Sequence, residues 1–379
     1  QSRHDIRPST NSTMRMMQVV KLLLLLSYPL AAKSWWGSLS PQTQGIGRVS
    51  AGPLEISEMG CGTWSWGNRL LFDYDPQQDE EIYQAYRRLR DAGVTVFDTA
   101  DSYGTLDLNG RAEILLGKFE RRYLGENTSG QTSKKQRQQV ATKLAPYPWR
   151  LTRSSLVEAA RGSLRRLEQD QVAIAQLHWS ASSYFPFQER ALWDGIGDVY
   201  QQGLCQAVGV SNYGPQQLKK VATYFQERNV PLAVAQIQYS LLTYKACQDM
   251  TDTCAEVNCR LLSYSPLCLG LLTGKYNVDN LPKSGPRRQL FRELLPSAQD
   301  LLATLEAVSQ DYDKSMAQVA INWALCKGTV PIPGARTLSM AEDNVSAANF
   351  RLRADAVEEL DRVAAAVRKP MIQNVFQTK

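Results

Sequence analysis

Four residues of this sequence have side chains suited to giving a proton to a carbonyl group. Each lies at or just beyond the end of a short apolar run: Asp98 and Tyr103 in VTVFDTADSY, Lys143 in QQVATKL and His178 in QVAIAQLHW. A tyrosine hydroxyl, with a pKa of about 10, donates its proton poorly at neutral pH, and a nearby ammonium lowers that pKa. We expect Lys143 to supply this charge, Asp98 to hold Lys143, and His178 to orient a substrate carbonyl. The four residues therefore predict reduction of an aldehyde or ketone by a hydride.

The elements that must position these residues alternate between short apolar runs and longer amphipathic ones. Eight strands separated by helices are typical of a (β/α)8 TIM barrel, an α/β fold whose active sites lie at the carboxyl ends of the strands. An open doubly wound sheet is the alternative, but the GxGxxG that such a sheet usually carries after its first strand is absent. The predicted strands are 55–63, 95–100, 139–145, 172–178, 207–211, 233–238, 260–265 and 329–334.

Helical patterns fill the intervals between these strands. Gly93 stands where the first helix would stop, and Pro215 stands at a first helical position. Three long loops are also expected, at 118–139, 180–190 and 275–296, and the last two leave the carboxyl face, where such loops often bind ligands. The predicted helices cover 79–93, 152–169, 215–229, 298–312 and 315–328.

Composition narrows the classes of function. The net charge is +6 and the pI about 8.9, without a basic stripe interleaved with aromatics, so no nucleic-acid partner is expected. The seven cysteines include no CxxC, and we expect reduced thiols, Cys254 and Cys259 among them, rather than a disulfide framework. Only two histidines, His4 and His178, are present. Most catalytic zinc sites need more than one histidine, so no metal is expected.

Residues 1–45 are interpreted as a targeting leader, and residues 46–379 as one barrel domain. MRMMQVVKLLLLLSYPLAA, from Met14, has the basic, apolar and small-residue regions of a secretory signal, and it is short for a membrane span. A membrane anchor is the alternative; we expect no membrane association of the mature form. The following KSWWGSLSPQTQGIGR lacks acidic residues, as plastid transit regions after a signal do. The leader therefore predicts delivery to a plastid, with the secretory pathway as the alternative.

In order and spacing, the motifs of residues 48–368 resemble those of the aldo-keto reductases, and of the plant plastid branch most. The resemblance implies a barrel with an N-terminal β-hairpin, monomeric or weakly associated, that binds NADPH and a small carbonyl substrate. It also places the family's catalytic tetrad on Asp98, Tyr103, Lys143 and His178, with Tyr103 as the general acid. The motifs are GCGTWSWG (60–67), FDTADSYG (97–104), ATK (141–143), LHW (177–179), GVSNY (209–213), QIQYS (236–240), SYSPL (263–267) and IPGARTLSMAEDN (332–344).

The resemblance also implies a set of cofactor contacts. It places Ser211, Asn212 and Gln236 on the nicotinamide carboxamide, Tyr264 on the nicotinamide ring, Ser265, Leu267 and Leu271 near the pyrophosphate, Arg336 on the adenosine 2′-phosphate, and Asp343 and Asn344 near the adenine. The chain departs from many members at Gly334-Ala335, Met340 and Asp343. The preference for NADPH therefore rests mainly on Arg336, whose rigid guanidinium suits a phosphate.

Several residues have two interpretations. Trp64, Trp149 and Trp179 either line an aromatic substrate pocket or pack under loops. Arg287 and Arg288 either clamp the cofactor pyrophosphate or form a solvated pair. The whole chain could instead be an NADPH-binding regulatory subunit similar to the potassium-channel β-subunits, or a reductase of one specialised aldehyde such as pyridoxal.

Overall fold

The computed structural model describes residues 45–126, 137–283, 285–372 and 374–378. The predicted leader lies outside the described residues except for residue 45, so the leader and the division into 1–45 and 46–379 stay predictions. The four catalytic candidates all lie within the described residues.

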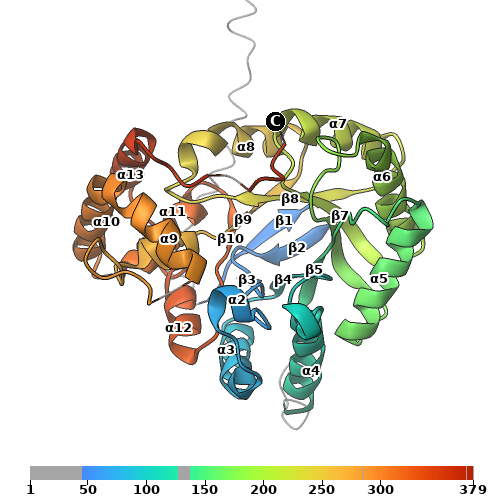
Figure 1. The fold of residues 1–379 in the computed structure, drawn as a ribbon, viewed down its shortest axis with the longest axis horizontal. Coiled ribbons are helices and arrows are strands. Elements are labelled where there is room, and N and C mark those ends of the chain that lie inside the picture. Colours follow the sequence, from blue (N-terminus) through green and yellow to red (C-terminus); the bar gives the residue numbers. More distant parts are fainter. Residues whose placement is uncertain (1–44, 127–136, 284, 373, 379) are drawn as a thin grey trace, which may run out of the picture. The chain divides into compact units, whose positions relative to one another are not determined.

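Eight parallel strands form the barrel at the centre of Figure 1. Each strand pairs with the next in sequence, and a bridge between Gly62 and Gly334 joins the first to the last. The predicted (β/α)8 barrel is therefore confirmed. The strands are β3 (Cys61–Gly62), β4 (Val96–Ala100), β5 (Gln139–Leu144), β6 (Val172–Leu177), β7 (Cys205–Ser211), β8 (Leu232–Gln238), β9 (Arg260–Tyr264) and β10 (Val330–Ile332).

An antiparallel hairpin precedes the barrel, formed by β1 (Arg48–Ala51) and β2 (Leu54–Ser57). Its Ala51 and Ile56 are buried in one apolar cluster with residues from the first halves of the barrel strands, so the hairpin covers the amino end of the barrel. The prediction of one strand over 55–63 was wrong, because this run serves two strands. Its first half pairs within the hairpin, and its second half, β3, pairs with β4.

Helices follow the strands and surround the barrel (Figure 1). As predicted, Gly93 lies just past a helix end with φ +94°, and Pro215 is the first residue of a helix. Other helices are capped by side chains. Thr152 is the N-cap of α5 and Ser315 is the N-cap of α11, and each side chain accepts a hydrogen bond from the backbone N–H three residues later. The main helices are α3 (Asp79–Asp91), α4 (Arg111–Glu126), α5 (Arg153–Leu167), α6 (Pro186–Gln201), α7 (Pro215–Gln226), α8 (Tyr244–Glu256), α11 (Met316–Cys326) and α12 (Leu338–Ser346).

Each of the three predicted loops proves partly helical. The segment 118–139 begins inside α4, 180–190 runs into α6 at Pro186, and 275–296 contains α9 (Gly285–Leu294). These charged or proline-containing stretches were mistaken for loops because their apolar positions are sparse. Short helices complete the structure: α2 (Arg69–Phe72), η2 (Pro76–Gln78), η3 (Leu106–Leu108), η4 (Cys268–Thr273) and η5 (Leu295–Ser297), together with the longer α10 (Gln299–Asp311) and α13 (Ala354–Ala366).

The C-terminal segment runs from α13 towards the ends of α7 and α8 (Figure 1). Backbone hydrogen bonds fix its course: Met371 N donates to Leu242 O at 3.0 Å and Thr378 N donates to Asn212 O at 3.1 Å. The Thr378 hydroxyl in turn accepts from Gly214 N at 3.0 Å. The tail is thereby attached to the segment that follows β7, at the carboxyl end of the barrel.

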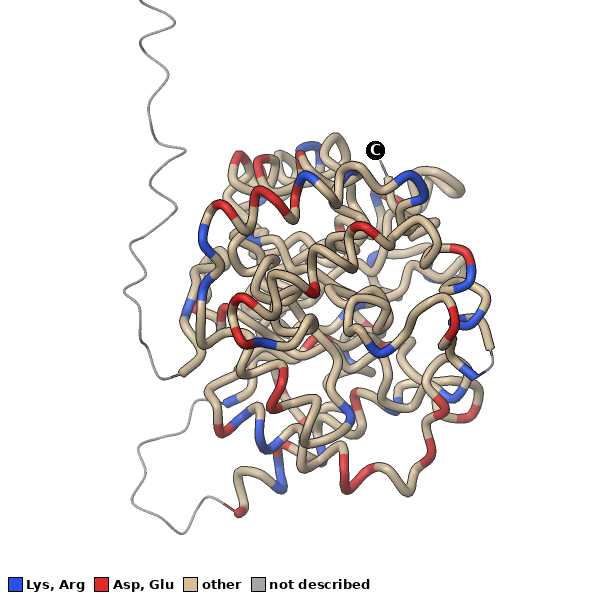
Figure 2. Tube along the Cα trace, turned by 90° about the vertical axis from the view of Figure 1, so that its left-hand side faces the viewer, with Lys and Arg blue, Asp and Glu red and all other residues tan. Residues whose placement is uncertain are grey.

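Acidic and basic residues are interspersed along the outer segments of the barrel domain (Figure 2).

All seven cysteines lie in described segments, and each is buried as a free thiol, as predicted. Cys254 is on α8 and Cys259 just beyond it. Among the described helices, none is both long and apolar enough to cross a membrane.

Candidate active site

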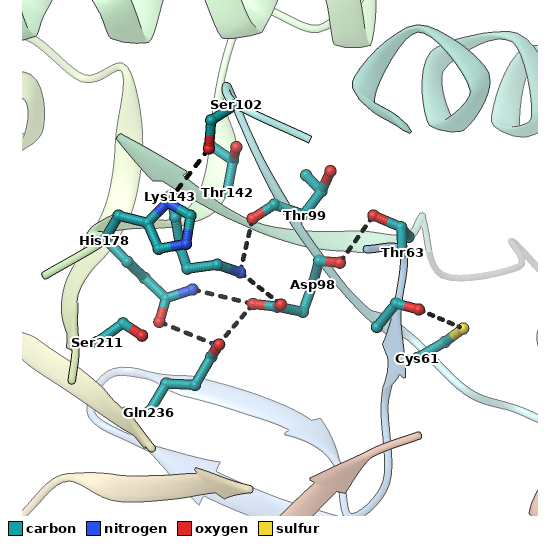
Figure 3. Close-up of polar contacts among 12 residues, drawn as sticks. Cys61, Thr63, Asp98, Thr99, Ser102, Thr142, Lys143, His178, Ser211 and Gln236 are labelled. Atoms are coloured by element: carbon teal, nitrogen blue, oxygen red, sulfur yellow. Dashed lines mark hydrogen bonds and ion pairs between the residues drawn. The ribbon is translucent and has the colours of Figure 1, made fainter. Parts of the chain in front are cut away.

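A buried ion pair lies at the carboxyl end of the barrel. Lys143 on β5 donates from Nζ to Asp98 Oδ1 on β4 at 2.5 Å, and to the carbonyl oxygen of Thr99 at 2.8 Å (Figure 3). Both side chains are almost fully buried, at 1% and 3% exposure. Burial lowers the pKa of Lys143, and the carboxylate of Asp98 opposes this shift. The predicted contact between these two residues is therefore present.

Two glutamines also hold the Asp98 carboxylate. Gln236 on β8 donates to Asp98 Oδ2 at 2.6 Å (Figure 3). Gln176 on β6 donates to the same oxygen at 3.2 Å. Gln176 was missed by the sequence reasoning. Its signal was a polar residue within the apolar strand VAIAQL, two positions before His178 and so on the same face of the strand. The carboxylate is thus oriented by three donors from three strands of the barrel, β5, β6 and β8.

Tyr103 lies in the turn after β4 with its ring over the amine of Lys143. The Nζ atom is 4.8 Å from the ring centroid. Burial first, then the charge of Asp98, raises the pKa of Tyr103 well above its ordinary value of 10. The expectation of a lowered pKa is therefore wrong for this structure. The reason is that Asp98 counters the charge of the ammonium while desolvation penalises the phenolate.

His178 follows β6 and faces Tyr103. The ring centroids are 5.7 Å apart and the planes are inclined by 71°. Burial, and then the positive charge of Lys143, lowers the pKa of His178 well below 6.5. The imidazole is consequently neutral at physiological pH, a form in which one ring nitrogen donates a hydrogen bond and the other accepts one. The four predicted catalytic residues thus lie together in one group.

The residues expected around the nicotinamide form a second group beside the tetrad. Asn212 donates from Nδ2 to His178 O at 3.0 Å, and its Oδ1 accepts from the Tyr264 hydroxyl at 2.9 Å. Asn212 has φ +61°, a conformation that asparagine tolerates better than most residues. Ser211 is a hydrogen-bond partner of Asn212 at 3.2 Å. Together with Gln236, these side chains present amide and hydroxyl groups at one end of the cavity.

One cavity of about 840 Å³ contains the tetrad and most of the predicted cofactor contacts. Its volume is in the usual range for small-molecule and cofactor sites. Its other end carries Arg287 from α9 and Arg336 from the segment between β10 and α12. Arg336 donates to Phe72 O at 2.6 Å. The predicted residues that line the cavity are Trp64, Asp98, Tyr103, Lys143, His178, Trp179, Ser211, Asn212, Gln236, Tyr264, Ser265, Leu267 and Arg336.

Arg287 and Arg336 repel each other, and both are half-buried. Burial and the charge of Arg287 lower the pKa of Arg336. The Nε of Arg287 is buried without a hydrogen-bond partner. Arg288 points elsewhere and donates to Pro282 O at 2.9 Å. A phosphate held between Arg287 and Arg336 would relieve the repulsion and satisfy the buried donor, so this end of the cavity fits an anionic group.

Three of the predicted cofactor contacts lie away from the cavity lining. Leu271 is fully buried in the apolar core. Asp343 accepts from Gln318 Nε2 at 2.7 Å and from the Ser315 hydroxyl at 3.1 Å, and so supports the start of α11. Asn344 is buried and donates to Gly334 O at 3.3 Å.

Of the three tryptophans predicted to contact the substrate, two line the cavity and one does not. Trp64 and Trp179 line the cavity, whereas Trp149 is 71% exposed, stacks on Tyr147 and lies outside it. Trp179 stacks on Phe376 of the C-terminal tail, with centroids 4.5 Å apart and planes 14° apart. Phe376 and Asn374 therefore belong to the cavity wall, and no sequence signal pointed to them because the tail is remote from the barrel motifs.

Comparison with known proteins identifies the family. A sequence model described as Aldo/keto reductase family matches residues 58–365, most of the barrel domain. The chain belongs to this family. It is 50% identical over 333 residues to a protein from Arabidopsis thaliana named pyridoxal reductase, chloroplastic, covering 88% of this chain and 90% of that protein. This relative agrees with the predicted likeness to plant plastid members.

More distant relatives include different types of protein. A probable voltage-gated potassium channel subunit beta from Oryza sativa subsp. japonica is 28% identical over 343 residues, covering 86% of this chain and 97% of that protein. A solved aldo-keto reductase of the silkworm Bombyx mori, complexed with NADPH, has a TM-score of 0.65 at 24% identity and covers 87% of this chain and 91% of that chain. This last likeness concerns the fold alone.

Proposed function

We propose that this chain is an NADPH-dependent reductase of aldehydes or ketones, with Tyr103 as the proton donor. The observation that carries the proposal is the position of Tyr103 and His178 above the buried pair of Lys143 and Asp98, in the wall of a cavity large enough for a cofactor. The 50% identity to a protein named as a pyridoxal reductase supports the same class of reaction.

The proposed proton transfer follows from the protonation states of Tyr103, Lys143 and His178. The raised pKa keeps Tyr103 protonated in the resting protein, so a proton is present to give to the carbonyl oxygen. The ammonium of Lys143, 4.8 Å from the ring centroid, stabilises the negative charge that develops on the phenol oxygen. Neutral His178 donates a hydrogen bond that orients the carbonyl. General acid catalysis of this kind contributes about 10²–10⁴-fold to a rate.

The cavity fits NADPH at both ends. Ser211, Asn212 and Gln236 offer amide and hydroxyl groups suited to a carboxamide, and Tyr264 offers a ring for stacking. Arg336 and Arg287 would hold the phosphates, because their guanidinium groups suit bidentate phosphate contacts. NADPH bound in this way supplies the hydride that reduces the carbonyl carbon. The protein's own part is to bind, to orient and to move the proton.

We propose pyridoxal as the first substrate to test. The substrate end of the cavity would be walled by Trp64, Trp179 and Phe376, which suit a flat aromatic aldehyde. Among the described residues that line the cavity, the cations other than Lys143 are Lys275, Arg287 and Arg336, from the segments after β9 and β10. With Arg287 and Arg336 assigned to the cofactor phosphates, we expect pyridoxal to be preferred over its phosphate ester.

A steady-state assay tests the proposal directly. NADPH oxidation is followed with pyridoxal, pyridoxal phosphate and a panel of simple aldehydes, with a matched reaction lacking the aldehyde as the control. Turnover with an aldehyde supports the reductase. Tight NADPH binding with no turnover on any aldehyde would contradict it and favour the NADPH-binding regulatory subunit, a function that the channel-subunit relative makes a natural second candidate.

We further propose a plastid location, reached through the leader, and a monomeric or weakly associated state. The support for the location is the likeness to a protein named as chloroplastic and the composition of residues 1–45. A fluorescent fusion to the leader separates a plastid from the secretory pathway, and equilibrium sedimentation measures the state of association.

A further inference from the structure

The hydroxyl of Ser102 is a hydrogen-bond partner of the His178 ring. Ser102 precedes Tyr103 in the turn after β4 and lines the cavity. Its Oγ is 3.4 Å from Nδ1 of His178 (Figure 3). A serine hydroxyl can donate its proton or accept one, so the direction of this hydrogen bond is tied to the tautomer of His178.

The tautomer of His178 decides whether Ser102 donates or accepts in this hydrogen bond. The imidazole is neutral, because burial and Lys143 lower its pKa. A neutral imidazole that donates to a carbonyl oxygen through Nε2 must leave Nδ1 as an acceptor. Ser102 must then donate to Nδ1. In the opposite tautomer, Nδ1 donates to Ser102 and Nε2 is unprotonated. The lone pair of Nε2 would then repel a carbonyl oxygen.

We propose that Ser102 is a positioning residue that holds His178 in the Nε2–H tautomer by donating to Nδ1. The inference rests on the proposed function, in which His178 donates to the substrate carbonyl.

Nitrogen NMR measures the tautomer without any turnover. The chain has two histidines, His4 and His178, so the full-length His4→Gln protein labelled with ¹⁵N-histidine gives the signals of one imidazole. We expect Nε2 to be protonated and Nδ1 to be unprotonated. Ser102→Ala should raise the population of the Nδ1–H form, and Ser102→Thr, which keeps the hydroxyl, should not. A wild-type Nδ1–H tautomer, or a spectrum that Ser102→Ala leaves unchanged, would overturn the proposal.

Kinetics supply the second readout. Ser102→Ala should lower kcat by about tenfold, the usual worth of one hydrogen bond, while the Kd for NADPH stays the same. Ser102→Thr, which keeps the hydroxyl, should retain most of the wild-type rate. Equal rates for wild type and Ser102→Ala would reject the positioning role. Absence of turnover in the wild type would reject the proposed function instead, and the NMR result would still decide the tautomer.

Discussion

Arg336 provides the sharpest test of how the cavity selects its cofactor. The guanidinium is half-buried at one end of the cavity, one of its nitrogens donates to Phe72 O at 2.6 Å, and Arg287 repels it. A 2′-phosphate placed there would gain a charge-assisted hydrogen bond and relieve the repulsion between the two guanidinium groups. Such a bond is worth about 1.5–3 kcal/mol. At about 1.4 kcal/mol for each factor of ten, Arg336→Ala should raise the Kd for NADPH by roughly 10–100-fold.

The same substitution should change the Kd for NADH by less than about threefold, because NADH has no 2′-phosphate and the loss is confined to that group. Fluorescence titration of both cofactors, at two salt concentrations, measures the difference. Arg336→Lys is the matched control, because it keeps the positive charge but loses the planar guanidinium that can make two hydrogen bonds to one phosphate. We expect this variant to lose an intermediate amount of NADPH affinity. Equal losses for NADPH and NADH would refute the assignment of Arg336 to the 2′-phosphate.

Three further predictions concern the tetrad and its surroundings. Lys143→Met should destabilise the fold by about 3–5 kcal/mol, because it leaves Asp98 buried without its cation; denaturant unfolding measures this, and adding Asp98→Asn should recover part of the loss. The second prediction concerns His178, whose pKa in the folded protein is well below the ordinary value of 6.5. Above pH 6.5 the imidazole is neutral in both the folded and the unfolded chain. Below pH 6.5 the unfolded chain binds a proton more readily than the folded protein does. Stability should therefore fall as the pH drops below 6.5, while kcat of reduction shows no break there; a rate loss with a midpoint near 6.5 would argue against a buried neutral imidazole. Phe376→Ala should raise KM for aromatic aldehydes more than for short aliphatic ones, since it removes the ring stacked on Trp179; equal changes would exclude a substrate contact.

Strands and helix ends that depend on the local pattern of apolar and polar residues could be predicted from the sequence. The strands predicted over 139–145 and 172–178 and the helix stop at Gly93 are set by neighbouring residues, and the structure confirms them as β5, which contains Lys143, and β6, which His178 follows. The run 55–63 was misassigned because an apolar stretch interrupted by glycine has the same pattern whether it forms one strand or two. Only the tertiary pairing with β1 and β4 decides between them.

The remaining differences depend on contacts that are distant in sequence. The raised pKa of Tyr103 reflects desolvation by the assembled barrel, which no spacing of charges reveals. Asp343 was assigned to a ligand, yet it supports α11 through Gln318. Trp149 was a candidate for the substrate pocket, but it stacks on Tyr147 and lies outside the cavity.

The most direct test of the central claim is a single-turnover experiment with Tyr103→Phe. Wild type and variant are each loaded with NADPH and mixed rapidly with pyridoxal, and the loss of reduced nicotinamide is followed. The variant should bind NADPH nearly as tightly as the wild type and react at least about a hundredfold more slowly, because it loses the proton donor but no cofactor contact. A variant that reduces the aldehyde as fast as the wild type would contradict the assignment of Tyr103 as the acid.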